Sequence, residues 1–164
     1  MEDDKDIAVE AKRQLAVLAI KHLKKVDART LTIFQKYGIF DSIKPNYQVY
    51  LDNLKAGLFY KKTSRDIVEN AILETSQIDP KVTYSDFKIC DAFDTLDKTN
   101  TIDVPCLIIC GKYDHLTPLK YSQFFHDKIK NSELHIIDKA SHGVMLEKPD
   151  KVNQAIKDFI NNNL

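Results

Sequence analysis

The chain has 164 residues, which is long enough for one ordinary domain with a hydrophobic core. Its 24 Lys and Arg residues balance 24 Asp and Glu residues, so no net charge favours nucleic acid or an anionic membrane as a partner. No stretch approaches the ~20 apolar residues of a membrane span, and the acidic N-terminus is unlike the basic start of a signal peptide. We therefore expect a cytoplasmic protein.

Residues 1–100 carry a succession of helical patterns. Apolar residues recur at helical spacing along residues 5–26 and, less regularly, along residues 29–37 and 47–59. Thr63-Ser-Arg-Asp66 resembles a capping box and predicts the start of a further helix. Asp79-Pro80 predicts another helix, which runs to about residue 94. We therefore predict a helical N-terminal segment over residues 1–100.

From residue 101 the pattern changes to strands alternating with helices. Val104–Cys110 is a continuous apolar run, which is typical of a strand buried on both faces. Thr117-Pro118 predicts the start of a helix, residues 134–138 predict a second strand, and Pro149 begins the last helix. The inner face of that last helix is predicted from Val152, Ile156, Phe159 and Ile160. The βαβα order predicts an α/β fold over residues 101–164 in which the two strands are parallel neighbours.

Neither the cysteines Cys106 and Cys110 nor His115 indicates a metal or redox site. Cys106 and Cys110 lie within the apolar run, where a thiol serves as a small core residue. His115 stands next to Asp114, but adjacent residues rarely converge on one ion, and no HxH or HxxxH spacing supports a metal site. We therefore predict no metal and no cofactor.

The placement of Asp114 and His142 points to a possible chemistry. Asp114 follows the first predicted strand, and His142 follows the second. Because parallel strands end at the same edge of a sheet, we expect the carboxylate and the imidazole to meet there. A carboxylate beside a histidine fixes the ring's tautomer and stabilises its protonated form, as in a nucleophilic triad. A turn aspartate and an ordinary loop histidine also fit the sequence, so the pairing is a hypothesis at this point.

Two longer motifs contain these residues. They are Val104-Pro-Cys-Leu-Ile-Ile-Cys-Gly-Lys-Tyr-Asp114-His-Leu-Thr-Pro118 and Ala140-Ser-His142-Gly-Val-Met-Leu-Glu147-Lys-Pro149. Together they resemble the closing segment of the α/β-hydrolase superfamily, in particular its small esterase and lipase-like members with a helical cap. The resemblance implies that Asp114 is the triad acid, that His142 is the general base, and that helices in residues 45–97 cover an acyl pocket. It does not extend to residues 1–40.

The nucleophile of that superfamily is absent from these residues. Its members carry Gly-x-Ser-x-Gly on a tight turn and a His-Gly-rich loop for the oxyanion hole, and neither motif occurs here. Six serines lack flanking glycines: Ser42, Ser64, Ser76, Ser85, Ser122 and Ser132. Ser141 adjoins His142 and is therefore poorly placed to align on that ring. We predict an incomplete α/β-hydrolase-like fold, a helical cap segment followed by the βαβα unit, that does not hydrolyse esters alone.

Two hypotheses for the function follow. In the first, the chain is the acid–base part of a truncated or split ester hydrolase whose serine comes from elsewhere. In the second, it is a non-catalytic oligomeric or binding module that keeps the fold. A two-stranded parallel sheet leaves edges and faces uncovered, so both hypotheses predict a partner. That partner is a second copy, by strand or helix exchange, or a separate N-terminal hydrolase half. An unrelated small α/β fold is the remaining alternative.

Overall fold

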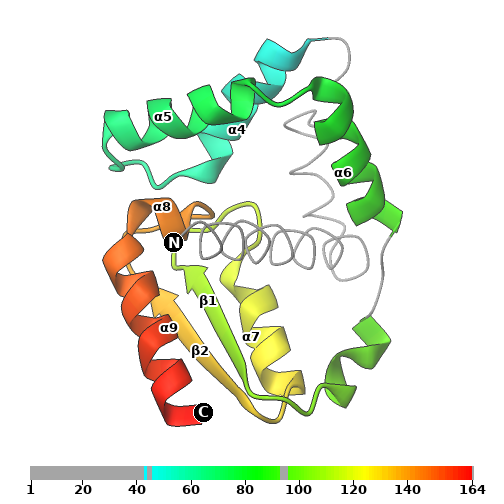
Figure 1. Cartoon of the computed structure of the whole chain (residues 1–164), viewed down its shortest axis with the longest axis vertical. Helices are drawn as coiled ribbons and strands as arrows, with labels where there is room; N and C mark the ends of the chain where they lie inside the picture. Colours follow the sequence, from blue (N-terminus) through cyan, green and yellow to red (C-terminus); the bar gives the residue numbers. More distant parts are fainter. Residues whose placement is uncertain (1–42, 44–45, 93–95, 164) are drawn as a thin grey trace.

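The computed structural model describes residue 43, residues 46–92 and residues 96–163 (Figure 1). Its helical part contains α4 (Tyr47–Leu58), α5 (Arg65–Ser76) and α6 (Pro80–Ala92). The 3-10 helix η1 (Leu96–Thr101) leads to β1 (Cys106–Gly111), α7 (Leu119–Lys128), β2 (Ser132–Ile137), α8 (Val144–Glu147) and α9 (Pro149–Asn163). The helices predicted over residues 5–26 and 29–37 lie outside the described residues. The division into residues 1–100 and 101–164 stays a prediction.

The α/β part is a three-layer arrangement of helix, sheet and helix. Figure 1 shows α7 and α9 on either side of the two strands, with α8 at the end of the sheet that faces α4 and α5. A cluster of buried residues at this end joins the sheet to the last helix: Ile137, Ala140, Val144 and Val152, with Ile109 and Met145 packed against them. The carboxyl ends of both strands therefore lie beneath the helical part of the chain.

The helix predicted over residues 47–59 is confirmed as α4. Asn46 caps its N-terminus, because the side-chain oxygen accepts a hydrogen bond from the amide of Val49 at 3.3 Å. Tyr50 and Leu51 of this helix are buried together with Ile43. Partly buried residues of α4, α5 and α6 pack around them: Tyr47, Leu54, Ile72, Tyr84 and Phe87. The three helices thus share one small core.

The starts of α5 and α6 differ in how well the sequence predicts them. The predicted helix start at Thr63–Asp66 is confirmed, since α5 begins at Arg65, but the capping box is wrong. Ser64 precedes the helix without a side-chain capping bond, and the Thr63 hydroxyl donates to Glu147 instead. The start at Asp79-Pro80 is confirmed, and the Asp79 carboxylate accepts from the amide of Lys81 at 2.8 Å. The predicted end of that helix near residue 94 lies outside the described residues.

The two strands pair in parallel, as predicted, with Cys106 opposite Ser132 and Gly111 opposite Ile137. β1 begins at Cys106 rather than Val104, because Pro105 has no amide hydrogen to give to the ladder. The amide of Cys106 makes the first such bond, to the carbonyl of Asn131 at 2.8 Å. β2 covers Ser132–Ile137, where residues 134–138 were predicted.

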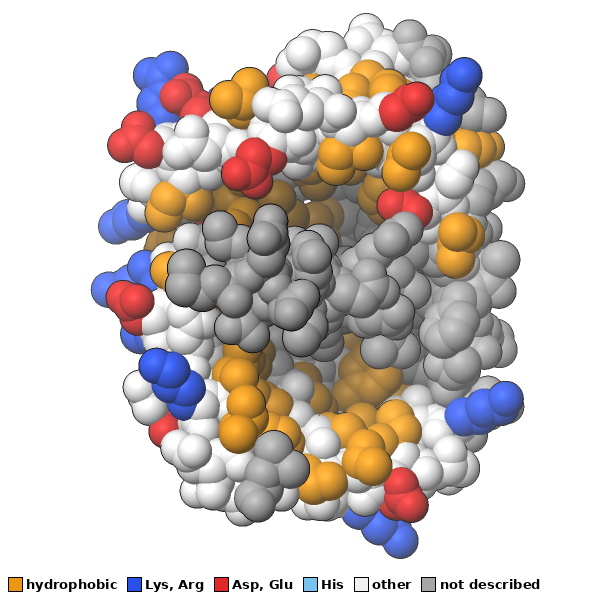
Figure 2. Space-filling view, in the orientation of Figure 1, with side chains coloured by type: hydrophobic (Ala, Val, Ile, Leu, Met, Phe, Trp, Pro, Cys, Tyr) orange, Lys and Arg blue, Asp and Glu red, His pale blue; other side chains and the backbone are white. Residues whose placement is uncertain are grey.

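The prediction that β1 is buried on both faces is wrong for the described residues. Its first four residues are half-buried, and only Cys110 and Gly111 are buried. The reason is that the sheet of the described residues has two strands, so β1 has a neighbouring strand along one edge. Nearby, Val104 and Ile136 are 59% and 45% exposed, and Figure 2 shows hydrophobic side chains at the surface over this part of the molecule. An apolar surface beside the sheet therefore lacks a partner within the described residues.

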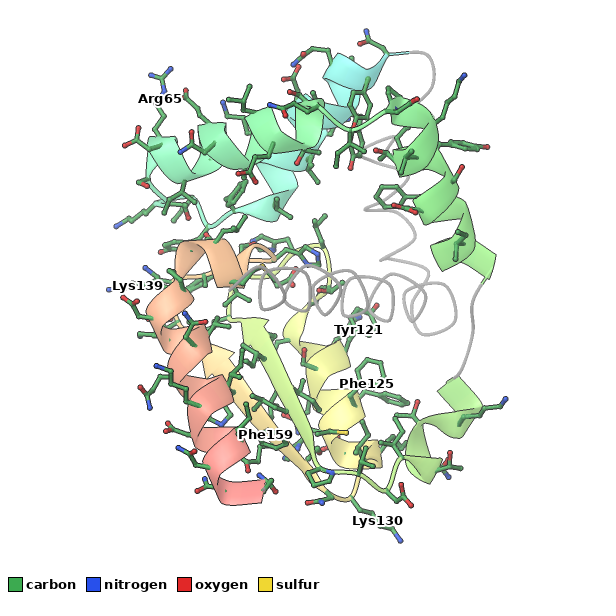
Figure 3. The ribbon with its side chains drawn as sticks, viewed as in Figure 1. Arg65, Tyr121, Phe125, Lys130, Lys139 and Phe159 are labelled. Atoms are coloured by element: carbon green, nitrogen blue, oxygen red, sulfur yellow. The ribbon has the colours of Figure 1, made fainter. Side chains whose placement is uncertain are left out.

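α7 and α9 lie on either side of the sheet, and the apolar face predicted for α9 is confirmed only in part. α7 begins at Leu119, after Pro118, and not with Thr117 as its cap. Tyr121 and Phe125 lie on one side of it (Figure 3). α9 buries Val152 and Ala155, and its Phe159 points towards the strands (Figure 3). Ile156 and Ile160, which were predicted on the inner face, are 40% and 46% exposed. Among the described residues, no helix is long and apolar enough to cross a membrane.

Candidate active site

The loops that follow β1 and β2 run side by side beyond the ends of the strands. The amide of Lys112 donates to the carbonyl of Ile137 at 2.9 Å, and the amide of Tyr113 donates to the carbonyl of Ala140 at 2.9 Å. Parallel pairing therefore continues past the sheet and brings the loop of Asp114 against the loop of His142. This is the edge at which an open parallel sheet gathers reacting groups.

Gly111 makes this close approach possible. A Cβ atom at Gly111 would lie 2.2 Å from the carbonyl oxygen of Ser141 and 2.6 Å from that of Ala140. Both neighbours are backbone atoms, which cannot swing aside as the end of a side chain can. Gly111 is also the last residue of β1, and its small size lets the two loops touch.

Asp114 is buried and holds four hydrogen bonds. Its Oδ1 accepts from the amides of Leu116 and Thr117 at 2.9 and 2.7 Å. Its Oδ2 accepts from the Thr117 hydroxyl at 2.6 Å and contacts His142 Nδ1 at 2.9 Å. Burial alone would raise the pKa of the Asp114 carboxyl, but the hydrogen bond and charge of His142 and the hydrogen bonds of Thr117 hold it below its usual value. The carboxylate is therefore both ionised and fixed in orientation.

His142 lies against this carboxylate and keeps some contact with solvent. Its side chain is 19% exposed, against 5% for that of Asp114. With Asp114 ionised, Nδ1–H is the donor of the 2.9 Å bond, and a neutral ring in that tautomer has its free lone pair on Nε2. A histidine held in this way can accept a proton at Nε2 while the carboxylate stabilises the imidazolium.

Thr117 is part of the arrangement, although the sequence analysis assigns it only a capping role. Besides donating to Asp114, its hydroxyl oxygen lies 3.1 Å from His142 Nδ1. The signal that could have revealed it is its position three residues after an aspartate at the end of a strand, where a local turn brings the two side chains together. Its hydroxyl holds one carboxylate oxygen of Asp114, while the backbone amides hold the other.

The described serines and cysteines are not aligned on His142. The hydroxyl of Ser141 donates to the carbonyl of Tyr113 at 3.0 Å, as fits its predicted unsuitability as a nucleophile. Among the described residues, the side-chain partners of His142 are Asp114 and Thr117, and neither is a serine or a cysteine. Cys110 is buried and Cys106 is half-buried, and burial raises the pKa of both thiols, so neither is a ready thiolate.

His115 does not join the pair. It is exposed, whereas Asp114 and Leu116 on either side of it are buried. Within the part of the chain that the structure describes, no three His, Cys, Asp or Glu side chains are grouped as a metal site. What the structure brings together is Asp114, Thr117 and His142.

The segment after α4 covers both loops. The amide of Gly143 donates to the carbonyl of Leu58 at 2.8 Å. The rings of Tyr60 and Tyr113 lie 4.8 Å apart, centroid to centroid, so the same segment also touches the loop of Asp114. The Asp114–His142 pair is therefore enclosed between the sheet edge and the helical part of the chain.

Comparison with known proteins finds relatives along most of the chain. A family model described as serine aminopeptidase, S33, matches residues 18–149, and so reaches into the N-terminal residues that the motifs do not cover. A proline iminopeptidase of Saccharolobus solfataricus is 41% identical over 68 residues, which are 42% of this chain and 22% of that protein. A pimeloyl-(acyl-carrier protein) methyl ester esterase of Neisseria meningitidis is 34% identical over 74 residues, 45% of this chain and 28% of that protein.

A solved structure of a thermophilic esterase has the same fold over much of the chain. It superimposes with a TM-score of 0.68 and 34% sequence identity, covering 76% of this chain and 50% of the esterase. The matched residues cover half of that esterase and about a quarter of each of the two curated relatives.

Proposed function

The chain belongs to the serine aminopeptidase, S33, family of α/β-hydrolases, and from this premise we propose that Asp114 and His142 are the acid and the general base of a serine hydrolase. The observation that carries the proposal is the 2.9 Å contact between Asp114 Oδ2 and His142 Nδ1, made by a carboxylate that three other donors hold in place. The reaction is acyl transfer to water.

The chemistry assigns each group a distinct step. His142 Nε2 takes the proton of a serine hydroxyl as that oxygen attacks the acyl carbon, and Asp114 stabilises the imidazolium that forms. His142 then gives the proton to the leaving alcohol or amine, and water releases the acyl group by the same steps in reverse order. Because the 164 residues contain no Gly-x-Ser-x-Gly, the serine of this proposal comes from another polypeptide or segment. The chain alone is then inactive.

The substrate class in this proposal is an acyl compound with an ester or amide bond. The support comes from two relatives whose names specify a methyl ester esterase and a proline iminopeptidase. Both reactions break a bond to an acyl carbon and need the same acid and base. The choice between ester and amide is therefore part of the test.

We also propose a partner along the free edge of β1. Its apolar residues are half-buried, and in the described residues the only strand beside it is β2. A second copy or a separate N-terminal hydrolase half would complete the sheet. Sedimentation at micromolar concentration tests this, and a well-behaved monomer would contradict the proposal.

The experiment that tests the catalytic proposal supplies the missing serine. The chain is co-expressed with the nucleophile-bearing half of a related esterase, and the purified complex is assayed with a p-nitrophenyl ester and a prolyl p-nitroanilide. We expect turnover that His142→Ala lowers by about 10³-fold or more. The matched control is His115→Ala, which removes the exposed neighbouring ring and should leave the rate unchanged. Absence of turnover in a folded stoichiometric complex, or turnover that His142→Ala does not change, contradicts the proposal.

A non-catalytic binding module is the second candidate, because the nucleophile elbow is missing from the sequence. A fluorophosphonate probe on the purified chain separates the chain's own chemistry from that of a complex. We expect no labelled serine on the chain alone and labelling of the supplied serine in the complex. A labelled serine on the isolated chain would overturn the view that it lacks a nucleophile.

A further inference from the structure

Glu147 is a buried carboxylate that the Asp114–His142 pair does not use. It ends α8 and is 7% exposed. Three groups donate to it: the amide of Tyr60 at 2.6 Å, the hydroxyl of Thr63, and the amide of Ser141 at 2.6 Å. All three are N–H or O–H donors, so the arrangement suits an ionised carboxylate with two accepting oxygens.

The two oxygens of Glu147 hold different parts of the chain. Oε1 accepts from Tyr60 and Thr63, which lie between α4 and α5 and are 87 and 84 residues away in sequence. Oε2 accepts from Ser141, the residue before His142. One side chain thus bridges the segment that covers the site and the loop that carries the histidine.

A second contact links the same segment to the residue after His142. The amide of Gly143 donates to the carbonyl of Leu58, and the position of a Cβ on Gly143 would be 3.1 Å from the ring of Phe59. The backbone on both sides of His142 is therefore held by the segment 58–63, through Glu147 on one side and directly on the other. A shift of this segment would move both attachments of the histidine.

We propose that Glu147 is a positioning residue that couples the covering segment 58–63 to the His142 loop, so that the placement of the imidazole against Asp114 depends on that segment. The proposal rests on the function proposed above for its catalytic meaning, but its geometry is independent of turnover. It assigns Glu147 no contact with substrate. The coupling makes the base correctly placed only when the covering segment is docked.

A simpler role is that Glu147 only braces its own loop through Ser141. Thr63 separates the two roles, because its hydroxyl donates to Glu147 from the covering segment and makes no hydrogen bond with residues 140–143. Thr63→Val keeps the shape of the side chain and removes the donor. If Glu147 couples the covering segment to the His142 loop, Thr63→Val should loosen that loop. If Glu147 only braces its own loop, Thr63→Val should have no effect on it.

The experiment measures amide hydrogen exchange of Ser141 and Gly143, and the tautomer of His142 by ¹⁵N NMR, in the full chain. We expect Thr63→Val to speed exchange at both amides by about fivefold, the factor for one net hydrogen bond, and to reduce the share of the Nδ1–H tautomer. Glu147→Gln should change the exchange rates and the tautomer in the same direction but more strongly. Its side-chain NH₂ group is a donor, and it would face at least one of the three donors that now reach the carboxylate. Glu74→Gln, the same chemical change on the exposed face of α5, is the matched control and should alter neither.

Every result decides the question. Effects from both Thr63→Val and Glu147→Gln support the coupling. An effect from Glu147→Gln alone, or from neither variant, overturns it. If Glu147→Gln does not fold, Thr63→Val decides by itself. Turnover plays no part in the readout, so a coupled His142 in a complex without hydrolase activity would overturn the proposed function and leave the coupling standing.

Discussion

Replacing Gly111 by alanine tests the closeness of the two loops directly. The added Cβ would lie 2.2 Å from the carbonyl oxygen of Ser141, 2.6 Å from that of Ala140 and 2.7 Å from the carbonyl carbon of Ala140. Contacts below 3.0 Å are essentially never seen for real Cβ atoms. The atoms in the way belong to the backbone, so the loops themselves must move apart by about 1 Å to restore ordinary contact.

That movement should cost stability and disturb the site together. Overpacking against a well-packed backbone costs about 1–3 kcal/mol, and we expect the upper end here because no side chain can yield. Two backbone hydrogen bonds of 2.9 Å hold the loops together, from the amide of Tyr113 to the carbonyl of Ala140 and from the amide of Lys112 to the carbonyl of Ile137. Moving the loops apart by about 1 Å would break both bonds. The Asp114–His142 contact, also at 2.9 Å, would lengthen with them.

Urea unfolding followed by circular dichroism measures the effect. With a slope of about 2 kcal/mol/M, a loss of about 3 kcal/mol lowers the midpoint by about 1.5 M. The matched control is Gly57→Ala in α4, where the new Cβ would meet Leu116 Cδ2 at 3.1 Å, the far end of a flexible side chain. Alanine is favoured over glycine in a helix by about 1 kcal/mol, so this control should unfold at the same urea concentration or a higher one. Equal midpoints for Gly111→Ala and the unsubstituted chain would refute the reasoning.

Three further substitutions, at Thr117, Asp114 and Lys139, should change the stability of the fold in predictable ways. Thr117→Val should lower the free energy of unfolding by about 1–2 kcal/mol, because Asp114 loses a buried donor; Thr117→Ser, measured beside it in urea, should lose less. The pKa of Asp114 is lowered by folding from 3.8, so its ionised carboxylate stabilises the folded state above that pH, and this contribution is lost as pH falls through the lower pKa of the folded state. Asp114→Asn should therefore make the free energy of unfolding, measured in urea, fall less steeply as the solution is acidified. An equally steep fall in both proteins would contradict this. Lys139 has a φ of 56°, a backbone conformation that glycine adopts more easily than lysine. Lys139→Gly should therefore raise the free energy of unfolding in urea by about 0.5–1 kcal/mol. A decrease would show that the contacts of the Lys139 side chain stabilise the fold by more than the backbone strain costs.

Where the sequence predicts the structure well, the signal is local. The helix α4, the proline start of α6 and the strand character of the run before Gly111 each depend on residues close to one another in the sequence. The approach of Asp114 to His142 was also predictable, because parallel strands must end at one edge of a sheet. Their roles in catalysis remain a proposal.

Where the sequence misleads, a polar side chain has a choice between near and distant partners. Thr63 stands where a helix cap is expected, yet its hydroxyl donates to Glu147, 84 residues away. A hydroxyl satisfies either bond equally well, so spacing cannot decide between them.

The order and types of the residues were thus enough to predict the helices and strands around the site and the absence of a nucleophile elbow from these residues. The parallel order of the two strands was enough to predict the shared edge of Asp114 and His142. Three-dimensional contacts were needed to show that Gly111 lets the loops touch and that Glu147 joins the covering segment to the histidine loop. Those facts depend on which backbones meet across the fold, and the free energy of burying a polar group is settled only by the partner it finds there.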